Sequence, residues 1–79
     1  MSKHPARLEN SPRLQRVHDL LADGREYSTM EIVLLANVCA VNSIADELRH
    51  PVNDVDIRCR QEGKVFFYKR WDVETEEAA

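Results

Sequence analysis

The chain has 79 residues, 43% of them apolar and 32% charged, and a formal net charge of −3. A chain of this length has room for one domain and one core, which buries roughly 60% of the surface that its unfolded form exposes. It contains no run approaching the roughly 20 apolar residues that cross a bilayer, and residues 1–5 lack the apolar stretch of a secretory signal. We therefore expect a cytoplasmic protein that makes no membrane contact.

The charges are distributed unevenly along the chain. Residues 1–16 carry a net charge of +3, residues 17–56 carry −6 and residues 57–71 carry +4, while residues 72–79 contain four acids. Nucleic-acid binding requires positive potential. The two basic segments are therefore the candidate regions for contact with DNA.

The first helix is predicted after a loose arm over residues 1–10. Ser11 is of the residue type that caps helix amides, and Pro12 suits the first helical position. Apolar residues then recur at helical spacing as far as Leu21. Gly24 tolerates the left-handed conformation that ends a helix. The sequence thus predicts one helix between these signals.

Two short helices are predicted next, joined by a tight turn. Ser28 and Glu31 form a capping-box pattern ahead of an apolar run, which predicts the second helix at about residues 29–36. The third helix is expected at about residues 40–49, and Pro51 ends it. Its apolar positions follow the i, i+3, i+4, i+7 pattern of a helix with one buried face: Val41, Ile44, Ala45 and Leu48.

After the third helix the apolar period changes from 3.6 to 2. Three apolar residues alternate with charged ones and predict a half-buried strand: Val55, Ile57 and Cys59. Residues 61–63 are the expected turn, in which Gly63 supplies a positive backbone angle. The β-branched and aromatic run from Val65 to about residue 71 predicts the second strand.

This order of elements predicts an α+β fold. Three helices followed by a two-stranded β-hairpin wing are the order of a winged helix-turn-helix domain, here spanning residues 11–71. Residues 72–79 are expected to form an acidic, disordered tail.

Several stretches resemble the small helix-turn-helix proteins common in phages and prophages. In that family Gly, a hydrophobic residue and Ser/Thr-Thr-Leu-Glu open the second helix, Ile-x-x-Leu-Arg lies in the third helix, and Tyr-x-Ile lies in the strand that follows. The corresponding stretches here are Ala22-Asp23-Gly24-Arg25-Glu26-Tyr27-Ser28-Thr29-Met30-Glu31-Ile32, Val41-Asn42-Ser43-Ile44-Ala45-Asp46-Glu47-Leu48-Arg49 and Val55-Asp56-Ile57. The resemblance covers about residues 14–71, mostly at core and capping positions. It implies a DNA-binding regulator or an excisionase-like architectural factor, although a fold alone does not establish function.

The implied DNA contact involves the third helix and the wing. A recognition helix reads base edges in the major groove, and the outward residues of this one include Asn42 and Ser43. Thr29 and the free amides at the start of the second helix can hold a phosphate. The complete predicted DNA-binding set is Thr29, Asn42, Ser43, Arg49, Arg58, Arg60, Gln61 and Lys64.

Two features favour a different function, a protein-interaction module built on the same scaffold. Asp46 and Glu47 on the predicted recognition helix would be repelled by phosphates. The second helix is apolar nearly all round, which exceeds what a surface helix of a small domain normally buries. Met30 and Leu34 are therefore the predicted subunit or partner interface, and a homodimer formed there would suit a palindromic DNA site. The prediction from the sequence is a DNA-binding protein of phage or prophage type, with the protein-interaction module as the alternative.

The sequence contains no pattern typical of catalysis or metal binding. It has no glycine-rich phosphate loop and no Cys–His or Ser–His arrangement at a supporting spacing. Cys39 and Cys59 lack the further ligands of a zinc site, and we expect two half-buried thiols in a reducing compartment. The prediction is a non-catalytic protein with no cofactor and no metal.

Overall fold

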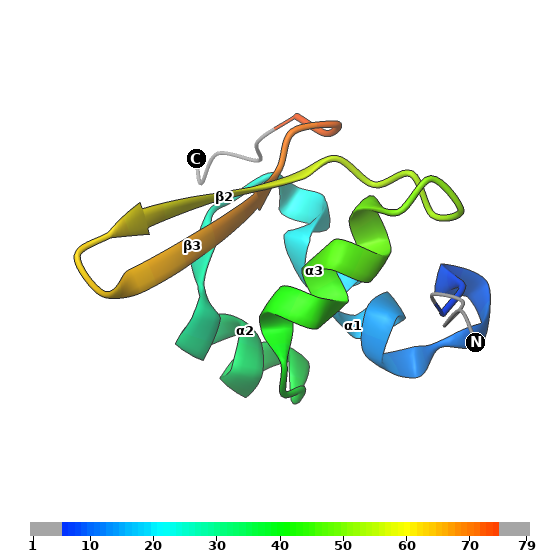
Figure 1. Ribbon diagram of the computed structural model, residues 1–79, viewed down its shortest axis with the longest axis horizontal. Coiled ribbons are helices and arrows are strands. Elements are labelled where there is room, and N and C mark those ends of the chain that lie inside the picture. Colours follow the sequence, from blue (N-terminus) through cyan, green and yellow to red (C-terminus); the bar gives the residue numbers. More distant parts are fainter. Residues whose placement is uncertain (1–5, 75–79) are drawn as a thin grey trace, which may run out of the picture.

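The computed structural model describes residues 6–74. Three helices form the body of the molecule, and a β-hairpin extends past them to one side (Figure 1). The elements in chain order are a 3-10 turn at Leu8–Asn10, α1 at Pro12–Leu20, a 3-10 turn at Leu21–Asp23, β1 at Tyr27–Ser28, α2 at Thr29–Ala36, α3 at Val41–Arg49, β2 at Ile57–Glu62 and β3 at Val65–Arg70.

The sheet has three antiparallel strands instead of the predicted two. β3 is the central strand, with β2 on one side and β1 on the other. In the short pairing of β1, Tyr27 lies opposite Tyr68 and Ser28 opposite Phe67. The fold is therefore α+β, with three helices and a three-stranded sheet, and this arrangement is compatible with a winged helix.

The core lies between the three helices and the sheet. The largest fully buried side chains are Leu14, Val17, Leu21, Ile32, Ile44, Leu48 and Ile57. Each large apolar side chain buried in this way stabilises the fold by about 1.5–3 kcal/mol relative to leaving it in water. The predicted apolar face of α3 is confirmed, because all four of its residues are buried.

The start of α1 differs in one detail from the prediction. Ser11 occupies the capping position, and its backbone carbonyl accepts the first bond of the helix from the Gln15 amide (3.0 Å), but its side chain makes no capping hydrogen bond within residues 6–74. At the other end Gly24 adopts a left-handed conformation with φ 74°. Its amide donates to the Leu21 carbonyl (3.1 Å), which ends the helical segment where the sequence predicted.

Capping contacts fix the ends of α2 and α3. The Ser28 hydroxyl accepts from the Glu31 amide (3.2 Å), and the Glu31 carboxylate accepts from the Ser28 amide (2.9 Å). The predicted capping box and the bounds of α2 are therefore confirmed. Asn37 (φ 54°) ends α2, and Ala40 (φ 50°) is also left-handed. Because a left-handed residue cannot continue a right-handed helix, α3 begins at Val41 and not at the predicted residue 40.

The hairpin is also shifted from its predicted bounds. β2 begins at Ile57, so Val55 is buried but lies outside the strand. Residues 61–62 continue β2, and the turn is made by residues 63–64, where Gly63 has φ 61°. The prediction of a glycine at the bend is thus confirmed, whereas the turn over residues 61–63 is wrong by about two positions.

The N-terminal segment packs against the domain, contrary to the predicted loose arm. The Leu8 amide donates to Oδ1 of Asn53 (2.7 Å), and Nδ2 of Asn53 donates to the Ala6 carbonyl (2.9 Å). The Gln15 side chain of α1 also donates to the Leu8 and Glu9 carbonyls (3.0 Å each), so side chains from two elements hold this segment. Residues 1–5 of the predicted arm lie outside the described residues, as do residues 75–79 of the predicted tail.

Candidate interaction surface

The outward face of α3 carries polar side chains whose charges are already paired. Asn42 and Ser43 are exposed in the first turn. Arg13 of α1 donates to both carboxylate oxygens of Glu47 (3.1 and 3.2 Å), and Arg49 pairs with Asp46 one turn before it. The two acids that opposed DNA binding in the sequence are therefore neutralised, together with the cations beside them.

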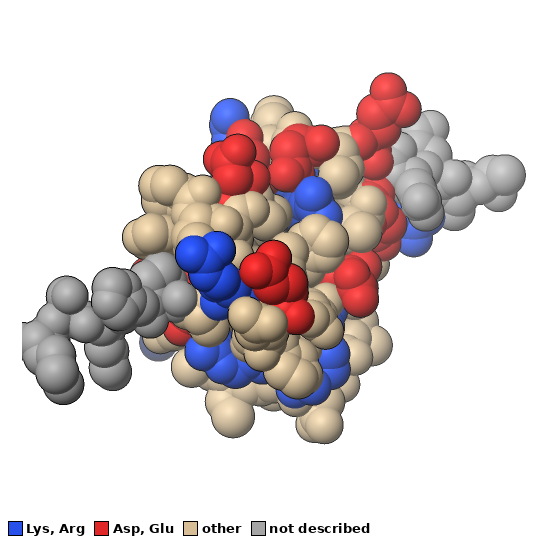
Figure 2. Space-filling view, turned by 90° about the vertical axis from the view of Figure 1, so that its right-hand side faces the viewer, with Lys and Arg blue, Asp and Glu red and all other residues tan. Residues whose placement is uncertain are grey.

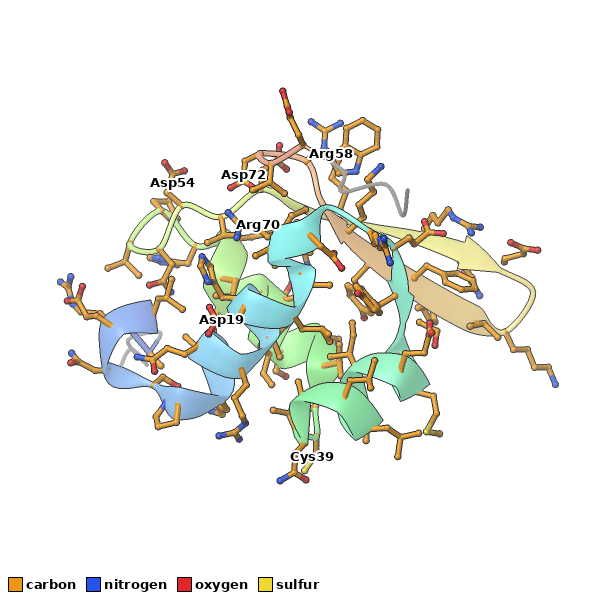
Figure 3. All side chains as sticks on the ribbon, turned by 180° about the vertical axis from the view of Figure 1, so that it is seen from behind. Asp19, Cys39, Asp54, Arg58, Arg70 and Asp72 are labelled. Carbon is orange, nitrogen blue, oxygen red and sulfur yellow. The ribbon has the colours of Figure 1, made fainter. Side chains whose placement is uncertain are left out.

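The hairpin turns Arg58 and Arg60 away from α3. Successive side chains of a strand point to opposite faces, and Ile57 of β2 is buried against the helices. Arg58 and Arg60 therefore lie on the outer face, where their guanidinium groups cover the rings of Trp71 (4.7 Å) and Phe67 (4.4 Å). Figure 3 shows Arg58 on the side of the hairpin opposite to the helices.

Carboxylates engage both of these arginines. Arg60 donates to both oxygens of Glu26 (2.6 and 2.7 Å) and to Glu62 (2.8 Å), while Arg58 pairs with Asp56 at 3.4 Å. The guanidinium of Arg60 lowers the pKa of the Glu26 carboxyl, and the two carboxylates raise the pKa of Arg60. The positive charge predicted for this part of the wing is balanced by acids within the domain.

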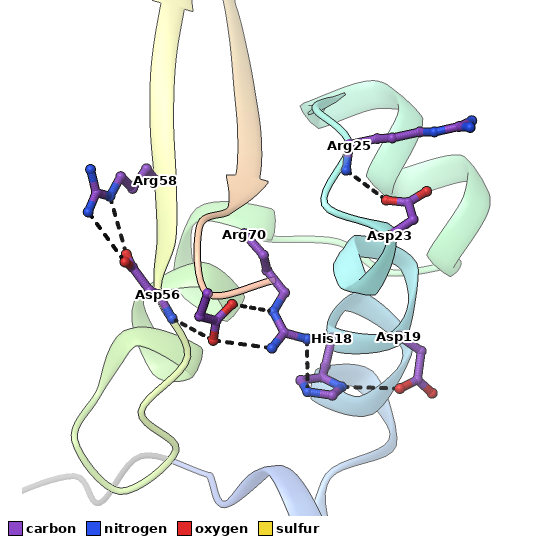
Figure 4. Close-up of polar contacts among 8 residues, drawn as sticks. His18, Asp19, Asp23, Arg25, Asp56, Arg58 and Arg70 are labelled. Carbon is purple, nitrogen blue, oxygen red and sulfur yellow. Dashed lines mark hydrogen bonds and ion pairs between the residues drawn. The ribbon is translucent and has the colours of Figure 1, made fainter. Parts of the chain in front are cut away.

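Arg70, the last residue of β3, has a structural role that the sequence analysis missed. It donates to both oxygens of Asp72 (2.9 and 3.2 Å) and to Nε2 of His18 (3.2 Å), as Figure 4 shows. Because a guanidinium only donates, Nε2 accepts, and Nδ1 carries the proton toward Asp19 (3.1 Å). Arg70 lowers the pKa of the Asp72 carboxyl. This largely buried arginine joins the end of the sheet to α1 and is not available to a ligand.

Acidic and basic side chains are interspersed on the surface. Figure 2 views the end of the molecule that carries the N-terminal segment and α1, and it shows red and blue side chains next to one another. Charge of one sign therefore does not dominate this end of the molecule.

Lys64 lies elsewhere, at the hairpin turn, and has no carboxylate partner within the described residues.

An apolar groove of about 500 Å³ separates the helices from the hairpin. α2 contributes Thr29 and Val33, α3 contributes Asn42 and Arg49, and the hairpin contributes Phe66 among others. The Thr29 hydroxyl donates to the Phe66 carbonyl (3.3 Å), so this residue connects the start of α2 to β3. The groove brings together three of the predicted DNA-binding residues, but its walls are mainly apolar.

A second hollow, of about 320 Å³, lies between the first turns of α2 and the tip of the hairpin. Met30 and Val33 line it from α2, and Lys64, Val65 and Phe66 line it from the hairpin. Three of its large apolar residues are exposed, Met30 64%, Val65 44% and Phe66 43%, and Leu34 (71%) lies one helical turn after Met30 on α2. We call the set Met30, Leu34, Val65 and Phe66 the α2–hairpin surface.

The exposure expected for Met30 and Leu34 is thus confirmed, and the structure adds two hairpin residues to them. Val65 and Phe66 were assigned to a strand on their β-branched and aromatic character, without a prediction of which face they occupy. The sequence did contain a signal for their exposure, since both residues directly follow the turn of the hairpin. The tip of the hairpin projects past the helices, so apolar side chains there are left uncovered (Figure 1).

The eight predicted DNA-binding residues fall in separate places. Thr29, Asn42 and Arg49 line the groove, and Lys64 lies at the hairpin tip, where Gln61 donates to the Gly63 carbonyl (3.0 Å). Ser43 borders a different hollow, beside the turn between α2 and α3. Arg58 and Arg60 occupy the outer face of the sheet. The structure does not bring these residues together as one basic surface.

Both cysteines are exposed, which corrects the prediction of half-buried thiols. Cys39 lies in the turn between two left-handed residues, at the far end of the helical layer in Figure 3. Cys59 lies on β2 opposite the buried Tyr68 of β3, where it lines the apolar groove. In the described part of the chain, no group of three or more His, Cys, Asp or Glu side chains is placed to hold a metal ion.

Comparison with known proteins found no matching family model, no matching curated protein and no matching solved structure. Within residues 6–74 no single helix is long and apolar enough to span a membrane. α2 and α3 meet that criterion only when they are taken together across a bend of 88°.

Proposed function

We propose that this chain is a non-catalytic binding domain with winged-helix architecture whose partner is a protein, contacted through the α2–hairpin surface. The observation that carries this proposal is the exposure of Met30, Leu34, Val65 and Phe66 around a hollow at the tip of the hairpin. Contiguous exposed apolar side chains are a mark of protein interfaces, since water around them is released when a partner covers them.

The electrostatics of the domain support a protein partner over duplex DNA. DNA affinity comes largely from lysines and arginines that replace counterions at phosphates. Arg49, Arg58 and Arg60 are each bound to a carboxylate of the same domain. A phosphate that recruited one of them would have to displace that carboxylate, which reduces the net gain.

The apolar groove beside α3 supports the same conclusion. Interfaces concentrate their binding energy in a few apolar or aromatic anchors that fill pockets. The groove and the hollow lie next to each other, since Thr29, Val33 and Phe66 line both. A partner that places one side chain in each would bury the exposed hairpin residues as well.

Peptide-display selection on the folded domain tests this function. We expect wild-type domain to select peptides with apolar anchors, and the variant with Met30→Glu and Phe66→Glu to lose them. Leu35→Glu is the matched control, because Leu35 is equally exposed on α2 but lines neither hollow. Selected peptides that bind the double variant as tightly as the wild type would refute the proposed surface.

Duplex DNA is the second candidate partner. The order of elements, the resemblance to phage and prophage helix-turn-helix proteins, and the exposed Asn42 and Ser43 in the first turn of α3 favour it. Titration of a labelled random duplex at low salt tests it by anisotropy. Joint replacement of Arg60 and Lys64 by Ala should weaken binding to all sequences, whereas Asn42→Ala should alter sequence preference. A flat titration of the wild type would remove this candidate.

A further inference from the structure

The α2–hairpin surface carries a protrusion and a hollow side by side. Among the described residues Leu34 is the most exposed large apolar one, and it follows Met30 by four positions, which places the two on one side of the helix. Met30 is also the wall of the hollow, with Val65 and Phe66 opposite. The protruding Leu34 side chain, which we call the knob, therefore lies beside the hollow between α2 and the hairpin.

We propose that the protein bound by this surface is a second copy of the chain, with Leu34 of each protomer seated in the hollow of the other. This inference rests on the proposed function and names its partner. A two-fold axis makes every contact twice, so the surface must carry both complementary shapes. Leu34 supplies one shape, and the hollow beside Met30 supplies the other. A hollow of about 320 Å³ is large enough for a leucine side chain.

The apolar area available sets the strength of the dimer. The exposed fractions of the four residues correspond to about 400 Å² per protomer, within the range of the largest patch on a typical monomer and about half the area that each partner buries in a stable complex. The dimer is therefore weak, with a Kd in the micromolar range or above. Its population depends on protein concentration.

The charge of the chain gives the dimer a distinctive response to salt. Each protomer carries a formal net charge of −3, so two copies repel each other. Added salt screens that repulsion and leaves the apolar contact intact, and dimerisation should therefore strengthen with salt. Binding to DNA should weaken with salt, because counterions are released there.

Sedimentation equilibrium of the full chain between about 5 µM and 1 mM tests the dimer. We expect the mean mass to rise from 9.2 kDa toward twice that value. Leu34→Glu should raise the dimer Kd at least tenfold, whereas Leu35→Glu should leave it within twofold, since Leu35 lies outside the proposed contact. Circular dichroism should show the same fold for both variants. A parent chain that stays at 9.2 kDa, or equal effects of the two variants, would refute the dimer.

Mixing two variants tests the reciprocal packing. Leu34→Glu and Met30→Lys should each fail to dimerise alone, since Met30 lines the hollow that receives Leu34. In an equimolar mixture, the introduced glutamate faces the introduced lysine at one contact, and the other contact is native. Dimer should therefore return in the mixture, and a mixture that stays monomeric contradicts the knob-in-hollow arrangement.

The dimer and the proposed function fail in different ways. If the chain is a monomer but still selects apolar peptides through Met30 and Phe66, self-association is refuted. The proposed function then stands, with a different protein as the partner. A monomer that selects none would refute both.

Discussion

Replacing Asp72 by Asn should destabilise the domain, because it removes the carboxylate that neutralises Arg70. The Arg70 side chain is 10% exposed and that of Asp72 is 32% exposed, so the pair lies between the buried and surface cases. Breaking a buried pair costs about 3–5 kcal/mol and breaking an exposed one about 0–1 kcal/mol. We expect a loss of about 1.5 kcal/mol of unfolding free energy at pH 7, and a melting temperature lower by roughly 6–12 °C.

The same pair predicts how that loss depends on pH. Arg70 lowers the pKa of Asp72 in the folded state, so the pair contributes stability at pH values above the ordinary aspartate pKa of about 4. That contribution begins to fall as the pH drops below about 4, and it is lost once the pH is below the lowered folded-state pKa and the carboxyl is protonated in both states. The difference between wild type and Asp72→Asn should therefore shrink in acid.

Urea unfolding followed by circular dichroism, at pH 7 and at pH 3, measures the loss of unfolding free energy and its dependence on pH. Asp19→Asn is the control, because Asp19 also belongs to the His18–Arg70 network but its side chain is 79% exposed. It should change the unfolding free energy by less than about 0.5 kcal/mol. An Asp72→Asn variant as stable as the wild type at pH 7, or one with the same deficit at pH 3, would contradict this role of the ion pair.

Three further substitutions test the fold by the same unfolding assay. Ile32→Ala, at a fully buried position of α2, should cost about 2–5 kcal/mol, and a smaller loss would mean that the core closes over the cavity. Ser28→Ala should cost about 1 kcal/mol through loss of the capping box, and an unchanged midpoint would contradict that contact. Gly63→Ala should cost about 1 kcal/mol from its φ of 61° alone, since an added Cβ meets nothing within 4 Å, and Gly63→Asn should cost less.

The helices could be predicted because their signals are local. The capping box at Ser28 and Glu31 and the left-handed glycine at Gly24 act within a single turn, and the structure places both as expected. The predicted start of α3 is wrong by one residue because Ala40 is left-handed. Alanine rarely adopts this conformation, so its presence in a sequence does not indicate it.

The third strand could not be predicted because its cause is tertiary. β1 consists of Tyr27 and Ser28, too short to show a period of two. It exists because the chain between α1 and α2 passes beside β3, where Tyr68 and Phe67 provide partners from the other end of the sequence. The packing of residues 6–8 through Asn53 has the same origin.

The candidate site was only partly accessible from the sequence. Alternation in β2 already implied that Arg58 and Arg60 share a face opposite to Ile57. What the sequence did not contain was their pairing, since Glu26 precedes β1 and reaches Arg60 across the sheet. Summed charge over residues 57–71 therefore overstated the positive potential that the hairpin presents.

The structure also joins two sets of residues that the sequence analysis kept apart. Thr29 and Lys64 belong to the predicted DNA-binding set and Met30 to the predicted interface, yet all three line the hollow at the hairpin tip. A dimer that fills this hollow with Leu34 covers the position of Lys64, which has no carboxylate partner among the described residues. Dimerisation and DNA contact at the hairpin tip therefore exclude each other. If both occur, the fraction of chain able to bind DNA must fall as its concentration passes the dimer Kd, and Leu34→Glu must remove that fall.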